Sequence, residues 1–170
     1  MSEITDLLST ITEFSIGLAG FSGVIGIFIR GSGGWLIVDR FRINNLLVMS
    51  LTPGFLAFFT MGLIQTIPES LAIRLSAAVF AIAVFLTLVF IPRARKRVPD
   101  HHQHLVGLHI FVPMSTTFFL ILVTQALIAI GVITSYIFTI YYYALVVMLL
   151  LAVFQFVRLI LARPEPETKQ

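Results

Sequence analysis

The stretch "LAIRLSAAVFAIAVFLTLVFI", residues 71–91, decides the fold class of this chain. It holds a single charged residue, Arg74, and a proline borders it on each side, at positions 68 and 92. A helix needs about 20 consecutive apolar residues to cross the roughly 30 Å of hydrocarbon in a bilayer. This stretch is therefore predicted to be a membrane-spanning helix.

The rest of the chain has the same character. Of its 170 residues, 58% are hydrophobic and 11% are charged, and the mean hydropathy is +1.02. Soluble domains carry about 25% charged residues, so this chain lacks the charge to cover a water-facing surface. We expect an all-α integral membrane protein. One five-span membrane domain, residues 1–163, should precede a disordered cytoplasmic tail, residues 164–170.

Five apolar stretches are long enough to span a membrane. They lie at residues 11–29, 43–67, 71–91, 110–133 and 136–161. The last two are separated by only a short turn, so a single re-entrant pair is the alternative there. In the second stretch, Pro53 followed by Gly54 predicts a kink, because proline removes a backbone hydrogen bond from a helix interior.

Basic residues predict the orientation, because cytoplasmic loops of membrane proteins are enriched in Lys and Arg. All but one fall in the first loop, the third loop or the C-terminal end: Arg30, Arg40, Arg42, Arg93, Arg95, Lys96, Arg97, Arg158, Arg163 and Lys169. Only Arg74 lies on the other side. This asymmetry predicts an outside N-terminus and a cytoplasmic C-terminus, in a cytoplasmic (inner or plasma) membrane.

Four tyrosines cluster at the predicted outer end of the fifth span: Tyr136, Tyr141, Tyr142 and Tyr143. Aromatic rings with a polar tip favour the headgroup zone of a membrane. We therefore expect all four to belong to an outer aromatic belt.

Small residues recur along the first span at alternating spacings of three and four. The seam consists of Ser15, Ala19, Ser22 and Gly26. Small side chains on one helix face let two backbones approach closely in lipid. Two interpretations stay open: the seam is the packed centre of the bundle, or it is a subunit interface or pore lining.

Four polar residues are expected in the outer half of the membrane. Glu13 and Arg74 are a candidate ion pair, because a charge within a span is costly unless it is paired or hydrated. The alternative is that each reaches the outer headgroups separately. Gln65 and Gln125 are candidates for an outer polar pocket.

The loop "RARKRVPDHHQHLVGLH", residues 93–109, allows three interpretations. It is a solvated loop that sets topology, a contact for anionic lipid, or a metal-binding or pH-sensing segment. The lipid contact would use Arg93, Arg95, Lys96 and Arg97. The weak metal candidates are His101, His102 and His104. Adjacent histidines usually point apart, and His104 to His109 is not the i, i+4 spacing of a helical ligand pair, so no metal and no cofactor are predicted.

Several enzyme classes do not fit the sequence. There is no cysteine, so thiolate catalysis is excluded. The stretch "DHHQ", residues 100–103, resembles the DHHC motif of protein palmitoyltransferases at three of four positions, but Gln103 stands where the nucleophilic cysteine belongs. All four histidines lie in one short segment, which disfavours a Ser–His–Asp arrangement. No catalytic residue is predicted, and the chain is expected not to be an enzyme.

The predicted function is that of a small membrane protein acting as a homo-oligomer, most concretely channel- or transport-like. The alternative is a non-catalytic accessory or scaffold subunit of a membrane complex, and the third interpretation is a lipid-modifying membrane enzyme. The expected partners are further copies of the chain and membrane lipids, including anionic ones. No nucleic-acid partner is expected, because the basic residues lie where membrane topology requires them.

Overall fold

The computed structural model describes residues 2–31, 37–95 and 108–161. These residues form five α-helices and no strand: α1 (Ser2–Gly31), α2 (Ile37–Ile64), α3 (Glu69–Arg95), α4 (Leu108–Ala129) and α5 (Ile137–Leu161). All five are long and apolar enough to cross a membrane. The prediction of an all-helical chain with five helices able to span a membrane is confirmed. The predicted tail, residues 164–170, lies outside the described residues.

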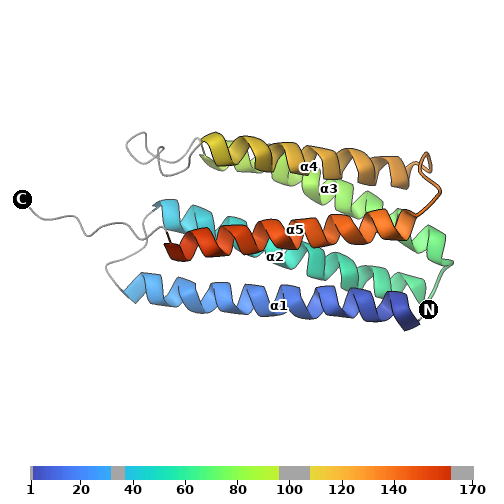
Figure 1. Ribbon diagram of the computed structural model, residues 1–170, viewed down its shortest axis with the longest axis horizontal. Helices are drawn as coiled ribbons and strands as arrows, with labels where there is room; N and C mark the ends of the chain where they lie inside the picture. Colours follow the sequence, from blue (N-terminus) through green and yellow to red (C-terminus); the bar gives the residue numbers. More distant parts are fainter. Residues whose placement is uncertain (1, 32–36, 96–107, 162–170) are drawn as a thin grey trace, which may run out of the picture.

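The helices run side by side along the long axis of the molecule (Figure 1). Helices α3 and α4 form one edge, α1 forms the opposite edge, and α2 and α5 lie between them. Helix α2 packs on α1, α3 and α5, whereas α1 packs chiefly on α2 and makes a smaller contact with α5. Helix α1 is therefore the edge element, with one face toward the bundle and the other turned away from it.

Two short turns and the start of α1 lie together at one end, which we call the hairpin end (Figure 1). In the first turn, the amide of Ile67 donates to the carbonyl of Leu63 over 2.9 Å. In the second, Gly131 adopts a φ of +82° and the amide of Val132 donates to the carbonyl of Leu127 over 3.0 Å. A glycine in this left-handed conformation commonly ends a helix. It explains why α4 stops at Ala129, before the predicted residue 133.

Helix α1 begins at Ser2, well before the predicted start at residue 11. Glu3 lies in its first turn, where a negative charge interacts favourably with the helix dipole. Leu8 and Ile11 are buried against the bundle. Their packing stabilises the N-terminal part of α1, although the sequence there is more polar. Glu13 consequently lies near the middle of a helix rather than near its beginning.

Three prolines lie within helices that continue past them, and one of these is Pro113, in the second turn of α4. Helix α2 runs through Pro53 to Ile64. Helix α3 continues past Pro92, the predicted boundary, to Arg95. A proline removes one backbone N–H donor from a helix. Pro92 lies near the last turn of α3, so its missing N–H costs that helix a single hydrogen bond. The neighbouring turns of α2 carry hydroxyl bonds to the backbone, including Thr52 Oγ1 to the carbonyl of Val48 over 2.7 Å.

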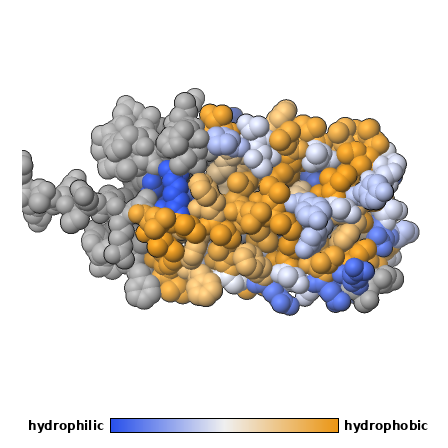
Figure 2. Space-filling view, viewed as in Figure 1, coloured by the Kyte–Doolittle hydropathy of each residue, from blue (hydrophilic) through white to orange (hydrophobic). Residues whose placement is uncertain are grey.

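The interior and the outer surface of the bundle are both apolar. Aliphatic side chains with Phe80, Phe118 and Tyr141 fill the interior, and large hydrophobic side chains from all five helices are exposed. Figure 2 shows a largely hydrophobic face between the two ends, with hydrophilic residues along the lower edge, where the N-terminal half of α1 lies. Such a surface suits a lipid environment, in which apolar side chains do not need to be hidden.

Candidate functional site

The predicted small-residue seam of α1 faces the inside of the bundle. Ser15 and Ser22 are fully buried, Gly26 is buried and Ala19 is half-buried. A β-carbon built on Gly54 of α2 would stand only 2.6 Å from the β-carbon of Ser15. The seam is thus packed against another helix of the same chain, although α1 is the edge element and not the centre of the bundle.

The hydroxyls near this seam bond mainly to their own helix. Ser22 Oγ donates to the carbonyl of Leu18 over 2.6 Å, and Thr12 Oγ1 donates to the carbonyl of Leu8 over 3.0 Å. Thr12 Oγ1 also approaches the carbonyl of Gly54 at 3.5 Å. Ser15 Oγ is buried and has no hydrogen-bond partner among the described residues. The inner face of α1 is therefore a close helix contact with few polar groups to offer a ligand.

The opposite face of α1 carries a second regular pattern, which was not predicted from the sequence. Six exposed residues follow one another at spacings of three and four, and we call them the outward stripe: Glu3, Asp6, Thr10, Glu13, Gly17 and Gly20. A β-carbon built on Gly17 or Gly20 would meet nothing within 4 Å. The outward stripe is thus polar at one end, small at the other, and uncovered by the other residues that the structure describes.

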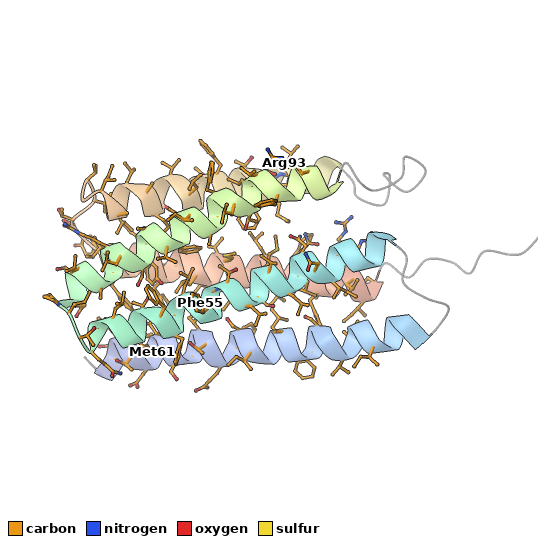
Figure 3. All side chains as sticks on the ribbon, turned by 180° about the vertical axis from the view of Figure 1, so that it is seen from behind. Phe55, Met61 and Arg93 are labelled. Atoms are coloured by element: carbon orange, nitrogen blue, oxygen red, sulfur yellow. The ribbon has the colours of Figure 1, made fainter. Side chains whose placement is uncertain are left out.

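Glu13 lies close to the middle level of the bundle. The candidate span of α1 is Glu3–Ile27, whose central residue is Ser15, and that of α2 is Arg42–Ile64, whose central residue is Pro53. The contact between Ser15 and Gly54 joins these two centres. Glu13 precedes Ser15 by two residues, or about 3 Å along the helix axis. Figure 3 shows Phe55, the residue after Gly54, near the middle of the bundle.

The structure does not bring Glu13 and Arg74 together. Glu13 is exposed on α1 and its Oε1 accepts a hydrogen bond from Ser9 Oγ at 3.2 Å. Arg74 is on α3, and its Nη1 would lie 3.3 Å from a β-carbon built on Gly131, in the turn between α4 and α5. The expected matching depth depended on a helix that started near residue 11, and α1 starts nine residues earlier, at Ser2 (11 − 2).

The two predicted pocket residues lie in different environments. Gln65 is exposed in the turn after α2. Gln125 is fully buried on α4, and neither its Nε2 nor its Oε1 has a hydrogen-bond partner within the described part of the chain. Gln125 therefore belongs to the interior, and Gln65 to the surface of the hairpin end.

A buried hydrogen-bonded group near the hairpin end links α2 to α5. The hydroxyls of Thr60 and Tyr141 are 2.8 Å apart, and each can donate to the carbonyl of Leu56, over 2.7 Å and 3.2 Å respectively. Each hydroxyl has one proton, so the pair makes two of these three hydrogen bonds at a time. The ring of Phe80 on α3 meets the Tyr141 ring edge-on, with centroids 6.1 Å apart. This arrangement joins three helices through one phenol.

Tyr141 thus corrects the predicted aromatic belt. Tyr136 and Tyr143 are 80% and 61% exposed and fit an interfacial position, whereas Tyr141 is fully buried. Tyr141 begins the inner face of α5, which continues through Leu145, Met148 and Ala152. These spacings of three and four were present in the sequence. They were obscured because every face of α5 is apolar.

The basic and histidine-rich loop lies largely outside the described residues. Arg93 is exposed toward the end opposite the hairpin end, where its Nη1 donates to the carbonyl of Val89 over 3.2 Å (Figure 3). Arg95 is the last residue of α3. The remaining lipid and metal candidates, Lys96, Arg97, His101, His102 and His104, fall in the stretch that the structure does not describe. Both roles stay predictions.

Comparison with known proteins does not add a relative. No protein-family model, no curated protein and no solved structure matches this chain. Within residues 2–31, 37–95 and 108–161, no three His, Asp or Glu side chains are grouped as metal ligands would be. The functional proposals therefore rest on the two faces of α1 and on the buried polar group near the hairpin end.

Proposed function

We propose that this chain is a multi-pass protein of the cytoplasmic membrane that works as a homo-oligomer in a channel- or transport-like role. The observation that carries the proposal is the exposure of Glu13 near the middle level of α1, on a face that no other helix of the chain covers. Half of the hydrocarbon thickness is about 15 Å, and Glu13 lies about 3 Å from the centre of the span along the helix axis. Its carboxylate would therefore lie about 12 Å from the nearer headgroups.

A lipid-facing carboxylate at this depth is unfavourable. Placing a charged residue at the centre of a membrane helix costs about 2.5–3.5 kcal/mol in insertion measurements. Ionisable side chains within spans consequently face a protein neighbour or water. The outward stripe therefore favours an assembly in which α1 does not face lipid.

The glycines of the outward stripe suit a close neighbour. Gly17 and Gly20 present a bare backbone on the same face as Glu13, and bare backbones allow close packing between membrane helices. Most soluble oligomers are symmetric assemblies of identical chains. Extending that pattern to this chain, several copies whose outward stripes face a common axis would surround hydrated carboxylates, which is an arrangement that attracts cations.

The distribution of charge supports an outside N-terminus. Arg42 near the start of α2, Arg93 near the end of α3 and Arg158 near the end of α5 all belong to the end opposite the hairpin end. Arg74 is at the hairpin end. Cytoplasmic ends of membrane proteins are the more basic ones, so the hairpin end is proposed to lie outside.

A second candidate function uses the same surface. An accessory or scaffold subunit would cover the outward stripe with a different membrane protein instead of a second copy. The edge position of α1 favours this alternative equally, because a single uncovered helix face fits either partner. Self-association of the purified chain distinguishes the two.

The test compares glycines of similar exposure on two helices. Gly17→Leu and Gly20→Leu place bulk on the outward stripe, and Gly62→Leu places the same bulk on the open surface of α2. We expect the purified chain to be oligomeric in mild detergent and both α1 variants to become folded monomers, while Gly62→Leu stays oligomeric. Liposomes with the wild-type chain should pass monovalent cations, and those with Gly20→Leu should not. A monomeric, inactive wild-type chain would exclude the homo-oligomer and leave the accessory subunit.

A further inference from the structure

Four buried polar side chains from four helices lie near the hairpin end, each four to seven residues from the end of its helix. Thr60 is four residues before the end of α2, Gln125 is four before the end of α4, and Tyr141 is four after the start of α5. Ser76 lies seven residues into α3. These helix ends meet at the same end of the bundle (Figure 1), and all four side chains are fully buried. We call these residues the polar layer.

The polar layer is only partly satisfied by its own hydrogen bonds. The hydroxyls of Thr60 and Tyr141 lie within hydrogen-bonding distance of each other and of the carbonyl of Leu56. The Ser76 hydroxyl lies close to the Tyr141 hydroxyl, yet Ser76 Oγ and both amide atoms of Gln125 have no hydrogen bond of acceptable geometry to any described residue. Each unsatisfied buried donor or acceptor costs about 1–3 kcal/mol. Surrounding lipid cannot supply the missing bonds.

The packing of the helices directs these groups toward the same interior. Helix α4 packs on α3 and α5, and its buried positions Met114, Phe118, Ile121, Gln125 and Ile128 form one face. The face of α4 that contains Gln125 is therefore turned toward α3, which carries Ser76, and α5, which carries Tyr141. The amide offers two donors and an acceptor, and the hydroxyls offer both functions.

We propose that the polar layer binds water, with at least one internal molecule bonded to the Gln125 amide and the Ser76 hydroxyl. A water molecule donates and accepts, as these groups require, and buried waters typically make about three hydrogen bonds to groups of this kind. A cation is disfavoured, because Arg74 is two residues from Ser76, and Glu3, Asp6, Glu13 and Glu69 are exposed. The site lies within α2–α5 and does not depend on the outward stripe.

The aromatic rings of the bundle provide a direct probe of such a water. X-ray radiolysis splits bound water into hydroxyl radicals, which add oxygen to the nearest side chain. Phe80 contacts Tyr141 of the polar layer, whereas Phe118 is equally buried on the same inner face of α4, seven residues from Gln125 (125 − 118). The two phenylalanines have the same chemistry, so a difference in modification reports water at the polar layer.

The experiment uses the full chain in detergent, equilibrated with H2¹⁸O and irradiated, with modified sites read by mass spectrometry. We expect Phe80 and Tyr141 to incorporate ¹⁸O several-fold more than Phe118. The double variant Gln125→Leu/Ser76→Ala should lose most of this excess while Phe118 is unchanged. Equal modification of Phe80 and Phe118 in the wild-type chain would overturn the proposal, whatever the variant does. An excess that persists in a folded double variant would also overturn it, because Gln125 and Ser76 would then not hold the water.

Discussion

Ser15 of α1 and Gly54 of α2 meet so closely that a β-carbon on Gly54 would stand 2.6 Å from the β-carbon of Ser15 and 3.0 Å from its Oγ. The contact joins the centres of the two candidate spans. Since α1 packs chiefly on α2, this contact holds the edge helix to the rest of the bundle and sets which face of α1 is turned outward.

Gly54→Ala should separate α1 from α2 and lower the stability of the chain. The added methyl cannot fit beside Ser15, and overpacking of this kind costs about 1–3 kcal/mol. The free energy of unfolding, measured by SDS titration, should fall by a similar amount. Gly62→Ala on the same helix meets nothing within 4 Å, so it should leave stability unchanged or raise it by up to about 1 kcal/mol through helix propensity. Equal effects of the two substitutions would contradict the contact.

Ser15→Gly should rescue Gly54→Ala, because it removes the β-carbon and the hydroxyl that the new methyl meets. The double variant should be more stable than Gly54→Ala alone in the same titration. Ser15→Ala keeps the β-carbon and should give little rescue. If Ser15→Ala rescues as well as Ser15→Gly, the hydroxyl rather than the β-carbon limits the approach of the two helices.

Tyr141→Phe should destabilise the bundle by about 1 kcal/mol, because a buried hydrogen bond contributes about 0.5–1.5 kcal/mol and its loss leaves Thr60 with one partner fewer. The matched control is Tyr143→Phe at an exposed position of α5, which should have no measurable effect. A double-mutant cycle with Thr60→Val should show positive coupling in the free energy of unfolding. Additive effects would mean that the two hydroxyls act independently.

Gly131→Ala should weaken the connection between α4 and α5. Gly131 has a φ of +82° and the guanidinium of Arg74 lies over it. A side chain in this conformation costs about 1–2 kcal/mol, in addition to displacing Arg74. We expect a lower thermal midpoint in detergent than for Gly23→Ala, which replaces a helical glycine with open space around it. A midpoint equal to that of the control would mean that the turn readily adopts another conformation.

Ser22→Leu should destabilise the fold itself, because Ser22 is fully buried within the chain. Val24→Leu adds bulk at an exposed position two residues away and should be tolerated. Size-exclusion chromatography and thermal aggregation report the two properties separately. Loss of the oligomer with a well-folded monomer in Ser22→Leu would place the seam between chains, against the packing described above.

The proposed orientation predicts which positions react with an impermeant thiol reagent. The chain has no cysteine, so single substitutions give clean signals. Cysteines at Ser2 and Ser135 should be labelled from outside intact cells, whereas cysteines at Ser32 and Gln103 should be labelled only after the membrane is opened. Labelling of Gln103→Cys in intact cells would reverse the orientation.

Hydropathy alone determined the class of this protein and the approximate location of its five spans. Runs of apolar residues are local properties, so the bounds of α5 agree with the prediction to within one residue at its start. The spacing of Ser15, Ser22 and Gly26 was also readable, because a helix repeats every 3.6 residues whatever it packs against. The sequence left open whether that seam faced its own chain or a neighbour.

Tertiary structure decided how each helix is rotated about its own axis. In a soluble helix the apolar stripe marks the inner face, but in these helices the lipid-facing side is also apolar, so hydropathy does not distinguish the two. For this reason the sequence misplaced Tyr141 at the headgroups, did not show that Gln125 points inward, and missed the exposure of Glu13 beside Gly17. The length of α1 was likewise decided by packing, because Leu8 and Ile11 bury against the bundle and extend the helix into a polar stretch.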